Sequence, residues 1–253
     1  MKILLRIAFL GKAYCGYQVQ PNGVTVQQRL NEAAKDLFGY DCDIVGCSRT
    51  DSGVHANEFY VAVSKKRAGF IETSIPVEKI PQAISVRLPN DISVLSASMV
   101  EDSFHPRYDV IYKEYVYQIW NGRARNPFLV DRSWHCPKPI DGKALERMQI
   151  AARAFVGKKD FASFMAADSK IKDSVRTVID ASVTREGDLI VFRVSADGFL
   201  YNMVRIFMGT LIDVAYGRID VDDIERIIKA CDRSEAGSTA PPEGLFLNKV
   251  VYK

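Results

Sequence analysis

The chain has 253 residues, of which 47% are hydrophobic and 26% are charged. Such a composition can bury the core of one large domain or two small ones. The longest apolar runs are far shorter than the roughly 20 residues that a membrane-spanning helix needs. The first residues, which include Lys2 and Arg6, carry charge too early for a signal sequence. The net charge of +3 is weak support for a nucleic-acid partner by itself.

The cysteine and histidine residues do not predict a metal site or a disulfide framework. The five cysteines are Cys15, Cys42, Cys47, Cys136 and Cys231, and the three histidines are His55, His105 and His135. None of these residues has the spacing of a metal-ligand set. We therefore expect free thiols, a cytoplasmic location, and no metal or other cofactor.

The first elements in chain order have clear signals. Apolar residues alternate through residues 3–9, which predicts a half-buried strand. Thr25 and Gln28 stand in the positions of a capping box, where each side chain bonds the other residue's backbone N–H. Apolar residues then recur at helical spacing until Gly39, which ends the predicted helix.

The rest of the chain continues to alternate strands and helices. We predict strands near residues 44–46, 59–63, 92–94, 112–119, 174–184 and 189–195, helices near residues 141–155, 200–214 and 221–231, and a last strand at the end of the chain. A rough strand–helix–strand order repeats in residues 1–105 and 106–253, which we predict to be two halves. This pattern predicts an α+β protein in which both halves contribute to one continuous, mostly antiparallel sheet.

The segment from Arg49 to Ala56 is the most informative part of the chain, with the sequence R-T-D-S-G-V-H-A. It places the carboxylate of Asp51 on a loop between two predicted strands, where binding and catalytic groups concentrate. Gly53 permits a positive backbone torsion, and Arg49 can keep the carboxylate ionised and oriented. A plain hairpin in which Asp51 caps its own turn fits the same residues.

Basic residues are concentrated between Arg147 and Arg176. This segment holds seven basic residues, Arg147, Arg153, Lys158, Lys159, Lys170, Lys172 and Arg176, against the three acidic residues Asp160, Asp168 and Asp173. Such a segment suits RNA phosphates, which supply affinity without reading sequence. An ordinary solvated face has the same composition, so both interpretations stay open.

Five blocks of the sequence, in order, resemble the motifs of the TruA-type pseudouridine synthases, which modify tRNA. Residues 49–56 fit that family's R-T-D-x-G-V-H-A loop throughout. The other blocks are Tyr14–Gln18 with Val26 and Gln27, Lys113–Tyr117 (K-x-Y-x-Y), Phe199–Arg205 (F-L-x-x-M-V-R) and Ala240–Leu247 (A-P-x-x-G-L and the last strand). Tyr17 stands where the family more often has Trp. The resemblance covers nearly the whole chain.

The resemblance implies the pseudouridine synthase fold, with two similar α+β halves that share the sheet and a central RNA-binding cleft. It implies a homodimer that binds one tRNA across both subunits and modifies uridines at positions 38 to 40 of the anticodon arm. The reaction breaks the bond between ribose C1′ and uracil N1, rotates the base, and rejoins it through C5. One ionised carboxylate suffices, as nucleophile or as base at the ribose.

Family roles transfer to matching residues of this chain. Asp51 would be the catalytic aspartate, and Tyr115 would pack on the flipped base. Arg49 and Arg205 would position the RNA backbone or the carboxylate, and Leu245 would form an apolar wall of the cleft. The mechanism asks for no imidazole, so we interpret His55, in the same loop, as structural.

The residues themselves leave alternatives for three of these positions. Tyr115 and Tyr117 are two residues apart on a strand, so both face the same side and either could stack on a base. Core packing is the more common role of a strand tyrosine. Arg205 opens an otherwise apolar helix, so it either pairs with a carboxylate, for which Asp51 is the candidate, or snorkels to the surface.

Two other classes of protein share part of this pattern. A non-catalytic RNA-binding module could use the same basic segment and sheet aromatics, but it has no reason to place Asp51 beside two arginines. A glycosidase also cleaves at an anomeric carbon, but it usually needs a second acid close by. No second acidic residue in the matched motifs fits that role, so the synthase interpretation is favoured.

Overall fold

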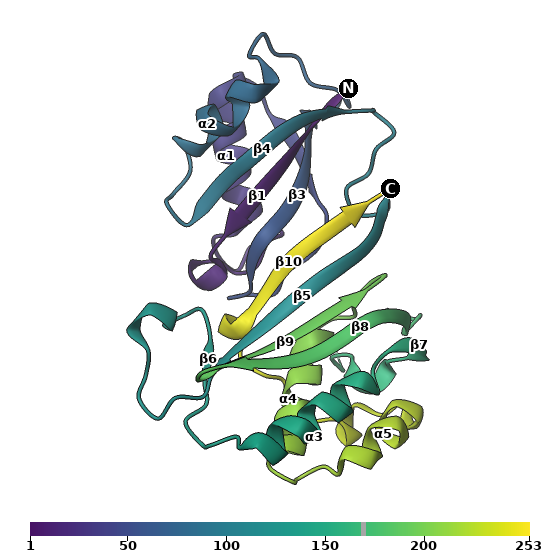
Figure 1. Cartoon of the computed structure of the whole chain (residues 1–253). Helices are drawn as coiled ribbons and strands as arrows, with labels where there is room; N and C mark the ends of the chain where they lie inside the picture. Colours follow the sequence, from purple (N-terminus) through teal and green to yellow (C-terminus); the bar gives the residue numbers. More distant parts are fainter. Residues whose placement is uncertain (168–170) are drawn as a thin grey trace. The chain divides into compact units, whose positions relative to one another are not determined.

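The computed structural model describes residues 1–167 and 171–253, so two members of the basic segment, Asp168 and Lys170, lie outside the described residues. The chain forms two compact units (Figure 1). The first unit comprises residues 1–111 and 246–253, and the second comprises residues 112–245. Both units combine helices with mostly antiparallel strands, which confirms the α+β class. The domain boundary near residue 105, the shared sheet and the central cleft stay predictions.

The first unit is built on strand β1, which pairs antiparallel with strands β3 and β4 on its two sides. Strand β2 pairs antiparallel with β3, and β10 pairs parallel with β3 at Phe246 and Leu247. The elements are β1 (Lys2–Phe9), α1 (Val26–Phe38), β2 (Cys42–Gly46), β3 (His55–Lys65), α2 (Ile80–Ser85), β4 (Ile92–Val100) and β10 (Leu245–Tyr252, whose first residue belongs to the second unit).

The core of the first unit lies between these strands and helices α1 and α2, which cover one face (Figure 1). The alternation in β1 is confirmed, because Ile3, Leu5 and Ile7 are at most 1% exposed. They share the core with Leu30 of α1 and Phe59 of β3. A strand with one covered face needs apolar residues with a period of two.

Helix α1 starts and ends where the sequence predicts. The Thr25 side chain accepts a hydrogen bond from the Gln28 backbone N–H at 3.2 Å, and Gly39 ends the helix with φ of 75°. The Gln28 side chain donates to Glu32 instead of turning back to Thr25, so half of the predicted capping box forms. Helix α2 was not predicted, because Pro81 in its first turn resembles a loop residue although proline is tolerated there.

The second unit is built on strand β9, which pairs antiparallel with β5 and β8. Strand β7 pairs with β8, and the short β6 runs parallel to β5. The elements are β5 (Val110–Trp120, whose first two residues belong to the first unit), β6 (Trp134–His135), α3 (Gly142–Arg153), β7 (Gly157–Asp160), β8 (Val175–Glu186), β9 (Leu189–Ala196), α4 (Met203–Ala215) and α5 (Ile224–Ala230).

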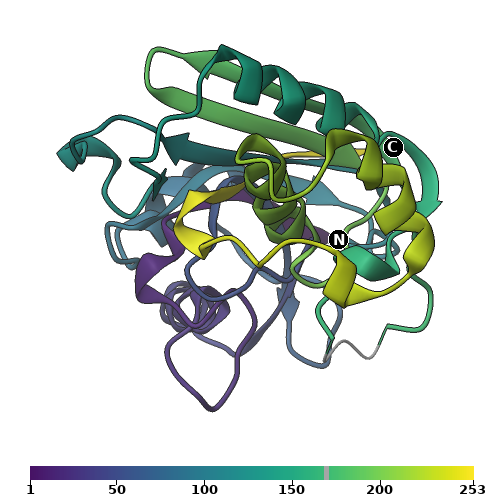
Figure 2. The same ribbon diagram turned by 90° about the horizontal axis from the view of Figure 1, so that it is seen from below.

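The second core is aromatic. Phe155 and Phe207 stack with ring centroids 4.0 Å apart, and Phe161 and Phe164 pack edge-on against Phe207. Helix α3 packs against β8 and α4, as Figure 2 shows from below. Helix α4 is buried on nearly all sides, which explains why its sequence is apolar all round.

Short 3-10 helices connect the larger elements: Gly11–Ala13, Val77–Lys79, Pro127–Leu129, Ala162–Phe164, Val221–Asp223, Arg233–Glu235 and Pro242–Gly244. All five cysteines are free thiols. In the part of the chain that the structure describes, no helix is both long enough and apolar enough to cross a membrane.

Candidate active site

Asp51 lies in a tight turn between β2 and β3 and is half-buried. Its carbonyl oxygen accepts a hydrogen bond from the Val54 N–H at 3.2 Å. Gly53 has φ of 80°, which confirms the positive torsion that the sequence predicts for this glycine. Glycine adopts this torsion without strain. Gly53 therefore lets the chain turn directly after Asp51 and enter strand β3.

The segment from Gly11 to Tyr17 holds this turn by its main chain. The Tyr14 carbonyl accepts hydrogen bonds from the Gly53 N–H at 3.4 Å and from the Ser52 hydroxyl at 3.2 Å. The Tyr17 N–H donates to the Thr50 carbonyl at 3.2 Å. These bonds lie on both sides of Asp51 in the sequence, so they fix the backbone that carries the carboxylate.

Two glycines make this contact sterically possible. A Cβ at Gly11 would lie 1.9 Å from the Val54 carbonyl oxygen, and a Cβ at Gly16 would lie 2.5 Å from the Thr50 carbonyl oxygen. No side chain fits at either position. The sequence motif around Gly16 is therefore part of the support for the Asp51 turn, which the sequence alone did not show.

His55 is structural, as predicted. It is fully buried, its Nδ1 accepts a hydrogen bond from the Gly11 N–H at 2.9 Å, and its ring stacks on Phe246 with centroids 4.6 Å apart. An accepting Nδ1 carries no proton, which fixes the tautomer of the ring. His55 thus connects the turn to the segment that supports it and to strand β10.

Tyr17 is part of the core of the first unit. It is 2% exposed, its ring lies 4.4 Å from that of Phe59, and a Cβ at Gly46 would meet it at 2.5 Å. Burial raises the pKa of its hydroxyl well above the usual value. The aromatic residue at this family position therefore packs inside the unit, where an indole and a phenol both serve as an apolar filler.

Arg49 is exposed, and it forms no ion pair with any residue in 1–167 or 171–253. It therefore does not form an ion pair with the Asp51 carboxylate in this structure. A guanidinium can bind phosphate through paired N–H donors, and this role of Arg49 stays a prediction.

The two tyrosines of β5 differ in their contacts. Tyr117 is fully buried, and its hydroxyl donates to the Pro241 carbonyl at 2.7 Å. Burial raises its pKa well above the usual value, so the hydroxyl stays protonated as a donor. Tyr115 is 6% exposed and packs edge-on against Phe199, with centroids 4.9 Å apart. Tyr117 is therefore committed to supporting the loop at Pro241, and base stacking by Tyr115 stays a prediction.

Arg205 ties the start of α4 to the same loop. Its Nε donates to the Ala240 carbonyl at 2.8 Å, and its Nη1 donates to Asn202 Oδ1 at 2.7 Å. Asn202 has φ of 61°, an uncommon conformation at the helix start. Arg205 is thus a half-buried, fixed guanidinium rather than a snorkelling surface side chain. Its pairing with Asp51, which belongs to the first unit, stays a prediction.

The loop from Gly237 to Leu245 is packed tightly on α4 and β5. The Gly237 N–H donates to the Thr210 hydroxyl at 2.9 Å, and a Cβ at Gly209 would lie 1.7 Å from the Ser238 carbonyl oxygen. A Cβ at Gly244 would lie 2.5 Å from the ring of Tyr117. Leu245 follows, 5% exposed, as the first residue of β10. Gly209 lies inside an otherwise apolar helix. A glycine in such a position is the sequence feature that indicates a close approach of another segment to the helix.

Only part of the basic segment is available to a partner. Lys159 pairs with Glu225, and Arg147 donates to the Ala215 carbonyl at the end of α4. Lys158 and Lys172 are exposed. Across the described residues, no group of three or more His, Cys, Asp and Glu side chains is placed to hold a metal ion.

Comparison with known proteins identifies the family. The family model described as "tRNA pseudouridine synthase" matches residues 6–109 and 151–253. The chain therefore belongs to the tRNA pseudouridine synthases, isomerases that convert uridine to pseudouridine.

Three relatives named "tRNA pseudouridine synthase A" place it in the TruA type. Those from Thermoanaerobacter sp. (strain X514) and Caldicellulosiruptor saccharolyticus are 41% and 42% identical over 250 residues, covering 99% of both chains. The relative from Bacillus licheniformis is 41% identical over 254 residues, covering 100% of this chain and 99% of its own.

Proposed function

We propose that this TruA-type synthase isomerises uridines at positions 38 to 40 of the tRNA anticodon arm, with Asp51 as its catalytic carboxylate. The observation that carries the proposal is the complete R-T-D-x-G-V-H-A loop, with Asp51 on a turn fixed by backbone hydrogen bonds from both sides. A turn held by its main chain leaves the side chain of its central residue available for chemistry.

Asp51 supplies the charge that the reaction needs. As the C1′–N1 bond breaks, its electron pair goes to the uracil, which rotates so that C5 faces C1′. After the new C–C bond forms, C5 loses its proton and N1 gains one, so the reaction is balanced without redox change. Asp51 serves as nucleophile or as base at the ribose, and both routes need an ionised carboxylate.

The other residues bind and orient the flipped nucleotide. Tyr115 stacks on the base and assists removal of the proton from C5. Arg49, exposed beside the turn, binds a phosphate of the distorted backbone. Arg205 holds the loop that ends at Leu245, and Leu245 forms the apolar wall. The enzyme is a homodimer that binds one tRNA across both subunits. It acts in the cytoplasm and needs no metal or other cofactor.

The test is a map of pseudouridine in bulk tRNA from cells that lack this protein and from cells that are re-supplied with it. We expect the modification at positions 38 to 40 to disappear and to return with the wild-type protein. Re-supply with Asp51→Asn is the matched control, and it should leave the positions unmodified. No change at any tRNA position would contradict the proposed activity, and would favour an RNA-binding module without catalysis.

A further inference from the structure

We infer that Tyr14 is a positioning residue for the catalytic loop, and that its hydrogen bond to Asp91 anchors the segment holding Asp51. This inference rests on the proposed role of Asp51. The Tyr14 side chain is not part of the reacting groups. The residue acts through its own carbonyl, which accepts the hydrogen bonds from Gly53 and Ser52.

The side chain of Tyr14 is fixed at its far end. It is 5% exposed, and its hydroxyl donates to Asp91 Oδ1 at 2.6 Å. A hydrogen bond to a carboxylate is shorter and about twice as strong as one between neutral groups. Burial, together with the nearby Asp91 carboxylate, raises the pKa of the Tyr14 hydroxyl, so the hydroxyl stays protonated as a donor.

Asp91 is a firm attachment point because it directly precedes strand β4. The Asp91 carbonyl accepts from the Leu10 N–H at 2.9 Å, and the next residue, Ile92, pairs with Phe9 of β1. The Gly11–Tyr17 segment leaves the end of β1 at this point. The Tyr14–Asp91 bond therefore ties the middle of that segment to the start of β4, beside the end of β1 from which the segment departs.

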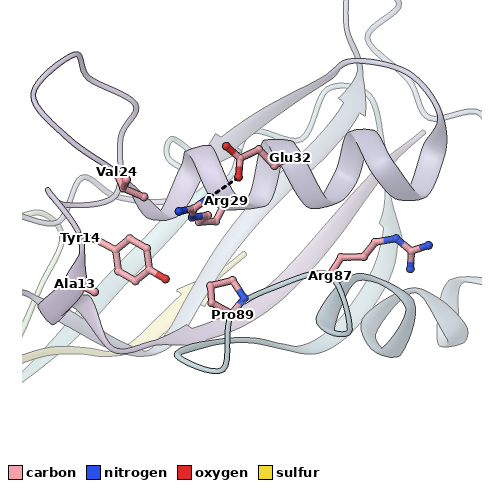
Figure 3. Close-up of a pocket in the computed structure, with 7 residues that line it drawn as sticks. All are labelled: Ala13, Tyr14, Val24, Arg29, Glu32, Arg87 and Pro89. Carbon is pink, nitrogen blue, oxygen red and sulfur yellow. Dashed lines mark hydrogen bonds and ion pairs between the residues drawn. The ribbon is translucent and has the colours of Figure 1, made fainter.

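The environment of Tyr14 shows why the bond matters. The ring borders a pocket of about 350 Å³ that also includes Arg29, Arg87 and Pro89 (Figure 3). The ring is buried although its hydroxyl end reaches this pocket, so the hydrogen bond to Asp91 fixes the end of the side chain that borders the pocket. Both arginines of the pocket are already paired with carboxylates, Arg29 with Glu32 at 2.8 Å and Arg87 with Asp36 at 2.6 Å, so the pocket is a poor anion site.

The experiment compares Tyr14→Phe, Asp91→Ala, Asp91→Asn and the double variant Tyr14→Phe/Asp91→Ala with wild type. The readouts are the single-turnover rate at saturating excess protein on a prefolded tRNA anticodon arm, and the affinity for that RNA. The single-turnover rate is used because, while active protein stays in saturating excess over the RNA, protein that fails to fold leaves the rate constant unchanged. Tyr252→Phe is the matched control, since it removes a hydroxyl bonded to the Pro106 carbonyl at 2.8 Å in the same unit.

We expect Tyr14→Phe and Asp91→Ala each to lower the rate roughly tenfold with little change in affinity, because small displacements of a catalytic group cost rate. The double variant should be no slower than the slower single variant, since both remove the same bond. Asp91→Asn keeps an acceptor, so it should be faster than Asp91→Ala. Tyr252→Phe should match wild type.

A rate within twofold of wild type for both Tyr14→Phe and Asp91→Ala would overturn the inference, and so would an equal loss in Tyr252→Phe. The inference would also be overturned if the loss of rate in the double variant equalled the product of the losses in the two single variants. If Tyr14→Phe does not fold, the difference in single-turnover rate between Asp91→Asn and Asp91→Ala still tests the inference. Failure of the wild-type protein to form pseudouridine would instead contradict the proposed function itself.

Discussion

The two loops that carry the candidate site residues differ in how much long side chains hold them. In the first unit, the turn at Asp51 is held by its main chain, against a segment whose glycines allow backbone to touch backbone. In the second unit, the loop before Leu245 is held largely by long side chains, the Tyr117 hydroxyl and the Arg205 guanidinium. Added atoms should therefore disturb both loops, because Gly209 and Gly244 also leave no room for a Cβ. Removed side-chain atoms should disturb mainly the second loop.

Among variants that change how the two loops are held, Gly16→Ala should have the largest effect. The new Cβ would lie 2.5 Å from the Thr50 carbonyl oxygen at a residue with φ of 78°, so the Asp51 turn must shift. We expect activity to fall at least tenfold and the free energy of unfolding to fall by about 1–3 kcal/mol. Enzyme assay and denaturant unfolding measure the two effects.

Gly39→Ala is the matched control for that variant. Gly39 has φ of 75°, but no atom lies within 4 Å of the place that a Cβ would take, so this change adds backbone strain without a clash. It should lower the free energy of unfolding by about 1 kcal/mol and leave activity near wild type. Equal loss of activity in both variants would show that stability, and not the Thr50 contact, is responsible.

A smaller effect should follow from Arg205→Lys, which keeps the charge. A lysine cannot donate to Ala240 and Asn202 from the same two directions as the guanidinium. We expect activity to fall several-fold and the free energy of unfolding to fall by about 1.5–3 kcal/mol, the usual range for a hydrogen bond to a charged group. Arg226→Lys, at an exposed pair with Asp223, should change neither. Wild-type activity in Arg205→Lys would show that charge alone suffices at position 205.

The smallest effect should come from the basic segment, outside both loops. Replacing the exposed Lys158 and Lys172 with Ala should weaken tRNA binding while turnover at saturation stays near normal. Each lost phosphate contact should lower the log–log salt slope by roughly 0.7 to 0.9 in magnitude. A salt series with wild type and the exposed pair Lys35→Ala/Lys79→Ala as control measures this. An unchanged slope would identify the segment as an ordinary solvated face.

The sequence predicts correctly those features of the fold that depend on residues close together in the chain. The period of β1, the Thr25 cap, the stop at Gly39 and the torsion of Gly53 each depend on a few neighbouring residues. Sequence reasoning missed contacts between distant residues. The Tyr14–Asp91 bond spans 77 positions, and nothing near either residue announces the other. The assignment of Tyr117 to loop support likewise depends on Pro241, 124 positions away.

The central claim is that Asp51 carries the chemistry on a turn that the rest of the first unit holds in place. The most direct measurement is turnover by purified Asp51→Asn, beside its affinity for the same tRNA. The change keeps the shape of the side chain and removes its charge, so the fold should survive. We predict no pseudouridine formation, with tRNA binding within a few-fold of wild type. Retention of even a tenth of wild-type activity would contradict the account.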